Sequence, residues 1–141
     1  VAPAAPTQPT YRMAQLFTLP THSSDAGHLT VFENILPGNI QRIFYIYGAG
    51  DAPRAGHRHK QAWNALMCVC GQCDVFIHDG QTEQTITLDA PDKALLLAPE
   101  DWHVMHSFSP GTVLLVASNM GYDKDDYIRE PYPDTTFSNG K

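Results

Sequence analysis

The 141-residue sequence lacks any apolar run near the ~20 residues that a helix needs to cross a bilayer. Its first ten residues, VAPAAPTQPT, have neither the basic start nor the apolar centre of a secretory signal. Both absences argue against a membrane or exported protein and predict a cytoplasmic location with reduced thiols. Residues 1–12 are expected to form a disordered tail rich in proline and alanine.

Positive charge is also scarce, since nine Lys and Arg face fifteen Asp and Glu, giving a net charge of −6. This balance excludes a broad basic surface for nucleic acid or an anionic membrane. The basic residues are nevertheless unevenly spread, and four of them fall between positions 42 and 60, where Asp51 is the only acid. The four are Arg42, Arg54, Arg58 and Lys60. They predict a local anion site, with solubilising surface charge as the alternative.

Cysteine is limited to Cys68, Cys70 and Cys73. The last two have the C-x-x-C spacing of redox and zinc sites. The intervening Gly71-Gln72 is typical of a type II′ turn joining two strands, which would place Cys70 opposite Cys73. We therefore interpret the cysteines as small buried thiols rather than as a redox or metal site.

Helical periodicity is nearly absent, and the only candidate helix is a short turn over residues 123–128. Instead, runs rich in Val, Ile, Leu, Phe and Tyr recur about every 8 to 12 residues between turn residues, which is an all-β signature. The predicted strands span residues 15–19, 29–33, 40–47, 57–59, 62–70, 74–78, 85–88, 94–98, 102–107 and 112–118. One barrel over residues 13–130 would remove exposed strand edges. Residues 131–141 are expected to form a C-terminal tail.

The most informative motif is Gly56-His57-Arg58-His59-Lys60. Side chains two positions apart on a strand point to the same face, so His57 and His59 are predicted to share one pocket. Arg58 and Lys60 are predicted to point away from it. Two neighbouring imidazoles suit either a metal site or an acid/base pair.

A metal site is the weaker of these interpretations. Metal-binding cupins follow two histidines with Glu after three or four intervening residues, and add a further histidine on a later strand. Here those positions hold Trp63 and the neutral amide Asn64, while His103 supplies the later histidine. Three imidazoles alone leave zinc as an open alternative, and the main prediction is a site without metal.

Acid/base chemistry is the stronger interpretation. An ordinary histidine pKa of about 6.5 lets the side chain take and release a proton at neutral pH, as abstraction of a proton next to a carbonyl requires. Tyr45 and Tyr47 share one face of the predicted strand 40–47, and a phenol there would hydrogen-bond the enolate oxygen. Packing in the core is the alternative for both tyrosines.

Four segments together resemble the dTDP-4-keto-6-deoxyglucose 3,4-ketoisomerases. They are IQRIFYIY at 40–47, RAGHRHK at 54–60, WHVMH at 102–106 and YDKDDYIR at 122–129. The resemblance implies a single-domain cupin, a double-stranded β-helix or jelly-roll barrel, that acts without metal or cofactor. It also implies a homodimer acting on a dTDP-linked keto-sugar.

The resemblance also implies roles for individual residues. His57 takes the place of the family's base, His59 that of its partner near the sugar oxygens, and Tyr45 that of a tyrosine beside the keto-sugar. Arg42 and Arg54 match arginines expected to hold the substrate and its diphosphate, and Asn64 replaces a glutamine. The same substrate pocket is expected to include Trp63, Trp102 and His103.

Two positions depart from the family pattern. Ala26 stands where an arginine is expected, which bears on the phosphate contacts. The family's Arg-Gly-x-His reads Arg54-Ala55-Gly56-His57, with the glycine shifted by one.

Three alternatives to the ketoisomerase remain open at this point. A sugar epimerase would use a histidine with a carboxylate partner, and no acid lies beside His57 or His59 on their strand. A metal-dependent cupin is disfavoured by Asn64. A non-catalytic sugar-binding cupin would have no need for two titrating groups.

Overall fold

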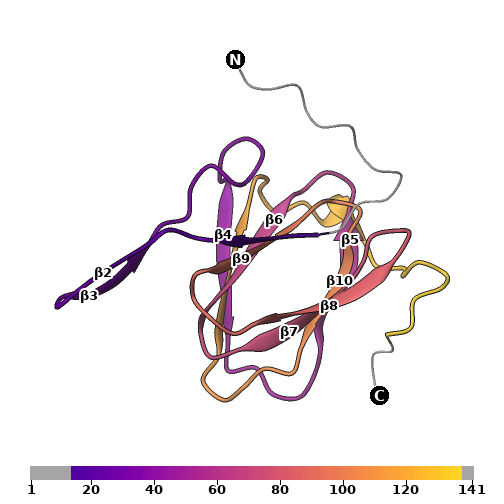
Figure 1. Ribbon diagram of the computed structural model, residues 1–141. Helices are drawn as coiled ribbons and strands as arrows, with labels where there is room; N and C mark the ends of the chain where they lie inside the picture. Colours follow the sequence, from indigo (N-terminus) through magenta and orange to yellow (C-terminus); the bar gives the residue numbers. More distant parts are fainter. Residues whose placement is uncertain (1–13, 138–141) are drawn as a thin grey trace.

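The computed structural model describes residues 14–137, so the tail expected at residues 1–12 lies outside it. Between these bounds the chain is all-β, as predicted, with twelve strands and one 3-10 turn (Figure 1). The elements are β1 Gln15–Thr18, β2 Thr21–Ser24, β3 Gly27–Thr30, β4 Arg42–Tyr47, β5 Arg54–His59, β6 Asn64–Cys70, β7 Cys73–His78, β8 Glu83–Leu88, β9 Lys93–Leu97, β10 Trp102–His106, β11 Val113–Ser118, η1 Lys124–Asp126 and β12 Tyr127–Ile128. No helix among these residues is long and apolar enough to cross a membrane.

Two five-stranded antiparallel sheets form the barrel. Their strand orders are β1-β9-β6-β11-β4 and β12-β5-β10-β7-β8. Successive strands often lie in different sheets, so the chain crosses repeatedly between them, as in a jelly roll. This arrangement confirms the predicted cupin barrel. It places β5 and β10, which carry the histidines, side by side in one sheet.

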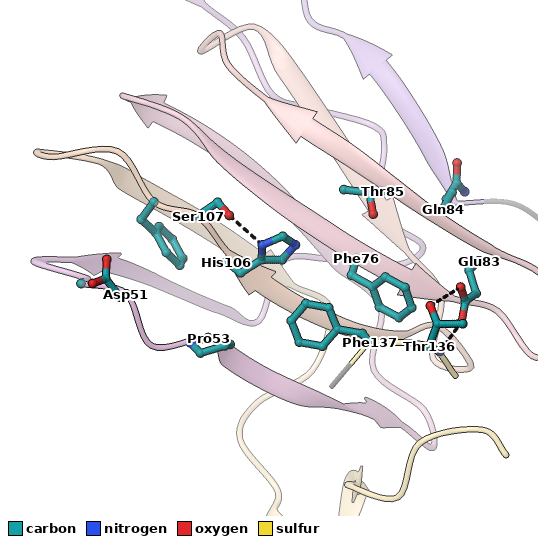
Figure 2. Close-up of a pocket in the computed structure, with 12 residues that line it drawn as sticks. Asp51, Pro53, Phe76, Glu83, Gln84, Thr85, His106, Ser107, Thr136 and Phe137 are labelled. Atoms are coloured by element: carbon teal, nitrogen blue, oxygen red, sulfur yellow. Dashed lines mark hydrogen bonds between the residues drawn. The ribbon is translucent and has the colours of Figure 1, made fainter. Parts of the chain in front are cut away.

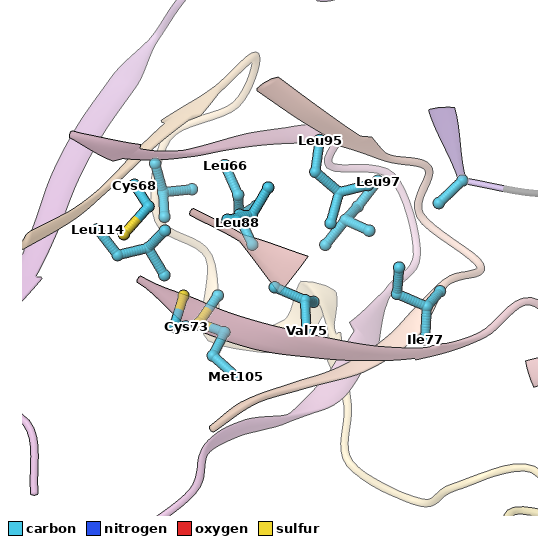
Figure 3. Packing of buried hydrophobic residues seen from close by; sticks show 12 residues of the cluster. Leu66, Cys68, Cys73, Val75, Ile77, Leu88, Leu95, Leu97, Met105 and Leu114 are labelled. Carbon is cyan, nitrogen blue, oxygen red and sulfur yellow. The ribbon is translucent and has the colours of Figure 1, made fainter. Parts of the chain in front are cut away.

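The space between the sheets is filled by aliphatic side chains from both (Figure 3). Leu66, Leu95 and Leu114 from the first sheet meet Val75 and Ile77 from the second, and all five are almost fully buried. Burying one such side chain stabilises the fold by about 1.5–3 kcal/mol. The core therefore supplies a rigid support for the polar residues at its edge.

The predicted hairpin at Gly71-Gln72 is wrong. Strands β6 and β7 belong to different sheets, so these two residues carry the chain from one sheet to the other. Gly71 has a φ of +77°, and a Cβ on it would lie 2.8 Å from the Thr112 Cα, so the crossing needs glycine. Cys70 is consequently exposed while Cys73 is buried, and they do not face each other across a ladder.

The N-terminal part contains a hairpin that the sequence did not predict. Strands β2 and β3 pair only with each other, and they project from the barrel as an arm (Figure 1). The expected strand 29–33 is shifted to Gly27–Thr30. Strand β2 reads THSS, which lacks the apolar alternation on which strand prediction depends.

The segment after β12, expected to be a tail, packs on the outer face of the second sheet. Phe137 contacts Phe76 and His106, while Glu83 accepts hydrogen bonds from the Thr136 backbone and hydroxyl (Figure 2). A wide hollow of about 740 Å³ lies beside these residues. It is separate from the cavity that His57, His59 and His103 line.

Candidate active site

A cavity of about 320 Å³ lies between the two sheets. Residues two apart on the same strand line it, as the strand period requires: Phe44 and Ile46 on β4, and Asn64 and Leu66 on β6. Both apolar and titratable side chains line it. This combination is typical of a small-molecule site.

Three imidazoles gather in this cavity. The ring centroids of His57 and His59 are 5.1 Å apart, and those of His57 and His103 are 5.0 Å apart. His57 and His59 come from β5, and His103 comes from β10 directly beside His57 in the sheet register. The structure thus brings together three residues that the sequence assigned to the site.

A bulge in β5 sets the direction of these side chains. The register with β10 shifts between His103 and Val104, opposite Ala55 and Gly56. Both bulge residues have positive φ, +74° for Ala55 and +78° for Gly56. Bulges commonly redirect side chains beside active sites. Ala55 is the position where the family pattern has glycine, and here alanine adopts the left-handed conformation.

Replacing Ala55 with glycine is expected to raise the free energy of unfolding by about 0.5–1 kcal/mol. Glycine adopts a positive φ without the side-chain clash that alanine suffers. Chemical denaturation monitored by tryptophan fluorescence would measure the change. Ala52→Gly is the matched control, because Ala52 lacks a positive φ and glycine there should slightly lower stability. A loss of stability in Ala55→Gly as large as in the control would contradict the expectation.

His57 and His103 are held neutral by their surroundings. Burial, followed by the neighbouring His103, His59 and Arg129, lowers the pKa of His57 to about 3. Burial also lowers the pKa of His103 to about 4, and its Nδ1 lies 3.0 Å from the Asp101 carbonyl oxygen. A carbonyl only accepts hydrogen bonds, so the proton of neutral His103 is on Nδ1.

His59 differs because it has a carboxylate partner. Its Nδ1 lies 2.8 Å from Oδ2 of Asp126, and both side chains are buried. Burial lowers the pKa of His59, while the hydrogen bond and the charge of Asp126 oppose that shift. The sequence showed no acid beside the histidines on their own strand, and Asp126 reaches His59 from η1 instead. The absence of an acid on β5 is therefore no ground for excluding an epimerase.

Tyr127 is a second site residue to which the sequence analysis gave no role. Its ring centroid lies 4.8 Å from that of His57 and 4.7 Å from that of His59. Its hydroxyl accepts a hydrogen bond of 3.2 Å from the guanidinium of Arg42, which also lines the cavity. Asp126 and Tyr127 both belong to the YDKDDYIR segment, so the signal was present without an indication of which residues enter the site.

The remaining predicted residues divide into two groups. Arg54 and Asn64 line the cavity, whereas Trp63 and Trp102 do not. Each tryptophan immediately precedes a cavity-lining residue, so strand alternation points it to the opposite face. Trp102 packs against Phe76 and donates a hydrogen bond to the Arg129 carbonyl.

Tyr45 lies at the cavity edge, but the structure does not turn its side chain toward the histidines. It is 60% exposed, and its ring stacks on Tyr47 on the outer face of β4. Arg42, Phe44 and Ile46 occupy the inner face of that strand. The phenol that contacts both imidazoles is that of Tyr127.

The donor set gives no positive indication of a metal. Among residues 14–137, no three or more His, Cys, Asp or Glu side chains are arranged to hold an ion. The Asp126 carboxylate lies at hydrogen-bond distance from Nδ1 of His59. Asn64 occupies the position that holds a carboxylate in the metal-binding pattern.

Comparison with known proteins identifies the family of the chain. Residues 12–137 match the family described as "FdtA: WxcM-like, C-terminal". The chain belongs to this family. A curated relative is the TDP-4-oxo-6-deoxy-alpha-D-glucose-3,4-oxoisomerase of Aneurinibacillus thermoaerophilus, 42% identical over 96 residues, which are 67% of this chain and 69% of that protein.

Solved structures of ketoisomerases share the fold. The 3,4-ketoisomerase of Helicobacter canadensis has a TM-score of 0.79 and 32% identity, covering 83% of this chain and 90% of that one. The 3,4-ketoisomerase QdtA of Thermoanaerobacterium thermosaccharolyticum has the same TM-score and identity, covering 83% and 87%. That QdtA structure is a variant with one histidine replaced by asparagine, in complex with TDP-4-keto-6-deoxyglucose. The protein is a TDP-sugar 3,4-ketoisomerase, as the resemblance implied.

Proposed function

We propose that the protein converts TDP-4-keto-6-deoxyglucose to the 3-keto sugar by acid/base catalysis that needs no metal. The 42% identical relative is named for this substrate, and the QdtA variant is in complex with it. The observation that carries the mechanism is the pair of imidazoles, 5.1 Å apart, in one cavity.

The reaction conserves all atoms and electrons. A base removes the C3 proton, and the electron pair moves toward the C4 carbonyl to form an enediolate. A proton then moves from the C3 oxygen to the C4 oxygen, and the base returns a proton to C4. One group must therefore serve carbon and another must serve the two oxygens.

We propose that His57 takes the carbon proton, as the resemblance implied, and that His59 serves the two oxygens. Burial, followed by the neighbouring His103, lowers the pKa of His57, so its imidazole is neutral and can take a proton. The Asp126 carboxylate, 2.8 Å from Nδ1 of His59, would stabilise the imidazolium formed when His59 takes the proton of the C3 oxygen.

The substrate's charged part is assigned to the arginines. Arg42 and Arg54 line the cavity beside the histidines, where a diphosphate would be held by charge-assisted hydrogen bonds. Asn64 and His103 also line it and would contact the sugar. Tyr45, Trp63 and Trp102 are not part of this proposed contact set.

We also propose that the protein is a homodimer. Edge strand β4 exposes Ile43, Tyr45 and Tyr47 on its outer face, and the β2–β3 arm exposes Leu29. An apolar edge of this kind is normally covered, and a second copy of the chain would cover it. Light scattering should give twice the mass of one chain, and a monomer would refute this proposal. The cytoplasmic location remains a prediction from the sequence.

Proton NMR in D₂O tests the reaction. EDTA-treated protein mixed with TDP-4-keto-6-deoxyglucose should produce the 3-keto sugar at an undiminished rate. Because C3 becomes a carbonyl carbon, its proton signal should be lost during turnover, and exchange of the base's proton with solvent should place deuterium at C4 of the product. Activity lost to EDTA and restored by a divalent metal would overturn the metal-free mechanism. Binding without turnover would favour a sugar-binding protein.

A further inference from the structure

The side chain of Tyr127 lies against both imidazoles of β5. It is half-buried and lines the cavity, and its ring centroid is 4.8 Å from that of His57 and 4.7 Å from that of His59. The proposed function places the reacting carbon at His57 and the two sugar oxygens at His59. A sugar held in this way also lies beside Tyr127, because the tyrosine ring contacts both histidines. The Tyr127 side chain is therefore close to the oxygens on which charge develops.

Arg42 determines the direction in which the Tyr127 hydroxyl can donate. Nη1 of its guanidinium lies 3.2 Å from the hydroxyl oxygen. A guanidinium only donates hydrogen bonds, so the oxygen is the acceptor and the hydroxyl hydrogen must point away from Arg42. Among residues 14–137, the hydroxyl has no other hydrogen-bond partner. Its hydrogen is therefore available to a ligand in the cavity.

The guanidinium of Arg42 is itself held by two aromatic rings. Its carbon lies 4.7 Å from the ring centroid of Phe44 and 5.3 Å from that of Tyr122. Attraction between a cation and the faces of two rings favours one position of the guanidinium. A hydroxyl that accepts a hydrogen bond from a cation is also a stronger donor, because successive hydrogen bonds polarise one another. Arg42 thus both orients and strengthens the Tyr127 hydroxyl.

We propose that Tyr127 is a catalytic residue whose hydroxyl donates a hydrogen bond to the C4 oxygen as that oxygen gains negative charge in the enediolate. The inference rests on the proposed function, which supplies the reaction and the place of the sugar. No bond of Tyr127 is broken, since His57 takes the carbon proton and His59 moves the proton between the oxygens. A donor aimed at a developing oxyanion stabilises the transition state more than the ground state.

Tyr127→Phe removes the hydroxyl and keeps the ring against the imidazoles. The kcat should fall by about 10²–10³-fold, the usual effect of removing one oxyanion donor, with KM changed less than about threefold. If Tyr127 contributes only the packing of its ring, the variant should keep the wild-type kcat. Tyr132→Phe is the matched control, because the Tyr132 hydroxyl also makes one hydrogen bond, to the Glu100 carbonyl, but lies outside the cavity. It should keep wild-type kinetics.

Solvent exchange separates this role from proton transfer between the oxygens. Exchange of the C3 proton and turnover both require the enediolate to form. In D₂O the two rates should therefore fall by the same factor in Tyr127→Phe. Exchange at the wild-type rate with slowed turnover would overturn the proposal, because the hydroxyl would then act only after the enediolate has formed.

A second variant tests the donor while keeping the hydroxyl and the shape of the side chain. Replacing Tyr127 with a difluorinated tyrosine gives a phenol that ionises near neutral pH, and an ionised phenol cannot donate a hydrogen bond. The kcat of this variant should fall as the pH rises through that ionisation, which the ultraviolet absorbance of the phenol reports. The wild-type kcat should not show this fall. A kcat that is unaffected by the ionisation would overturn the proposal.

The two proposals fail in different ways. Wild-type protein that does not turn over TDP-4-keto-6-deoxyglucose would overturn the proposed function and, with it, the role of Tyr127. An active wild type with an equally active Tyr127→Phe would overturn the role of Tyr127 alone and leave the proposed function intact.

Discussion

Replacing His57 with asparagine is expected to lower kcat by about 10²–10⁴-fold, the usual contribution of a well-placed acid/base group. Asparagine fills similar space and hydrogen-bonds, but it cannot take a proton from carbon. The loss of the C3 proton signal in D₂O should stop together with turnover, because both depend on the same abstraction. Calorimetry with TDP should show binding close to that of the wild type.

His59→Asn is the matched variant, since His59 lies two residues away in the same cavity. If His59 serves the oxygens, this variant should turn over slowly yet still exchange the C3 proton with solvent. The opposite result, with exchange lost in His59→Asn and retained in His57→Asn, would assign the carbon proton to His59.

Acid should destabilise the protein through its buried histidines. His103 is 2% exposed, and burial lowers its pKa from 6.5 to about 4. Between these pH values the unfolded chain binds a proton that the folded chain does not. The free energy of unfolding is therefore highest above pH 6.5 and falls as the pH drops toward 4, by about 3 kcal/mol from His103 alone.

Urea unfolding at several pH values measures this effect. His103→Gln removes the titrating group, so its free energy of unfolding should depend less steeply on pH between 6.5 and 4 than that of the wild type. His22→Gln, which removes an imidazole from the exposed β2–β3 arm, should retain the wild-type slope. Equal slopes in His103→Gln and the wild type would show that folding does not lower the pKa of His103.

The barrel and the histidine cluster were accessible from the sequence because both depend on local periodicity. Alternating apolar runs located most strands to within a few residues, and the i, i+2 rule placed His57 and His59 together. The same rule, applied to Trp102 beside His103 and to Trp63 beside Asn64, would have directed both tryptophans away from the cavity. Those two assignments were avoidable.

Other features depend on contacts between distant segments, which local patterns do not record. A glycine turn between two apolar runs looks the same in the sequence whether the two strands pair or lie in different sheets. The strands on either side of Gly71 lie in different sheets. Asp126 and Tyr127 stand in a polar, acidic segment typical of a surface turn. They reach His59 only because β12 pairs with β5.

The position of Asp126 along the chain bears on how the site is assembled. The eleven strands β1–β11 precede the segment that carries Asp126 and Tyr127. Strand β12 lies at the edge of its sheet, so the pairings among β1–β11 do not depend on it. Asp126, the hydrogen-bond partner of His59, lies 67 residues after it in the sequence. The barrel can therefore form without the Asp126 carboxylate, and the site is complete only when β12 pairs with β5.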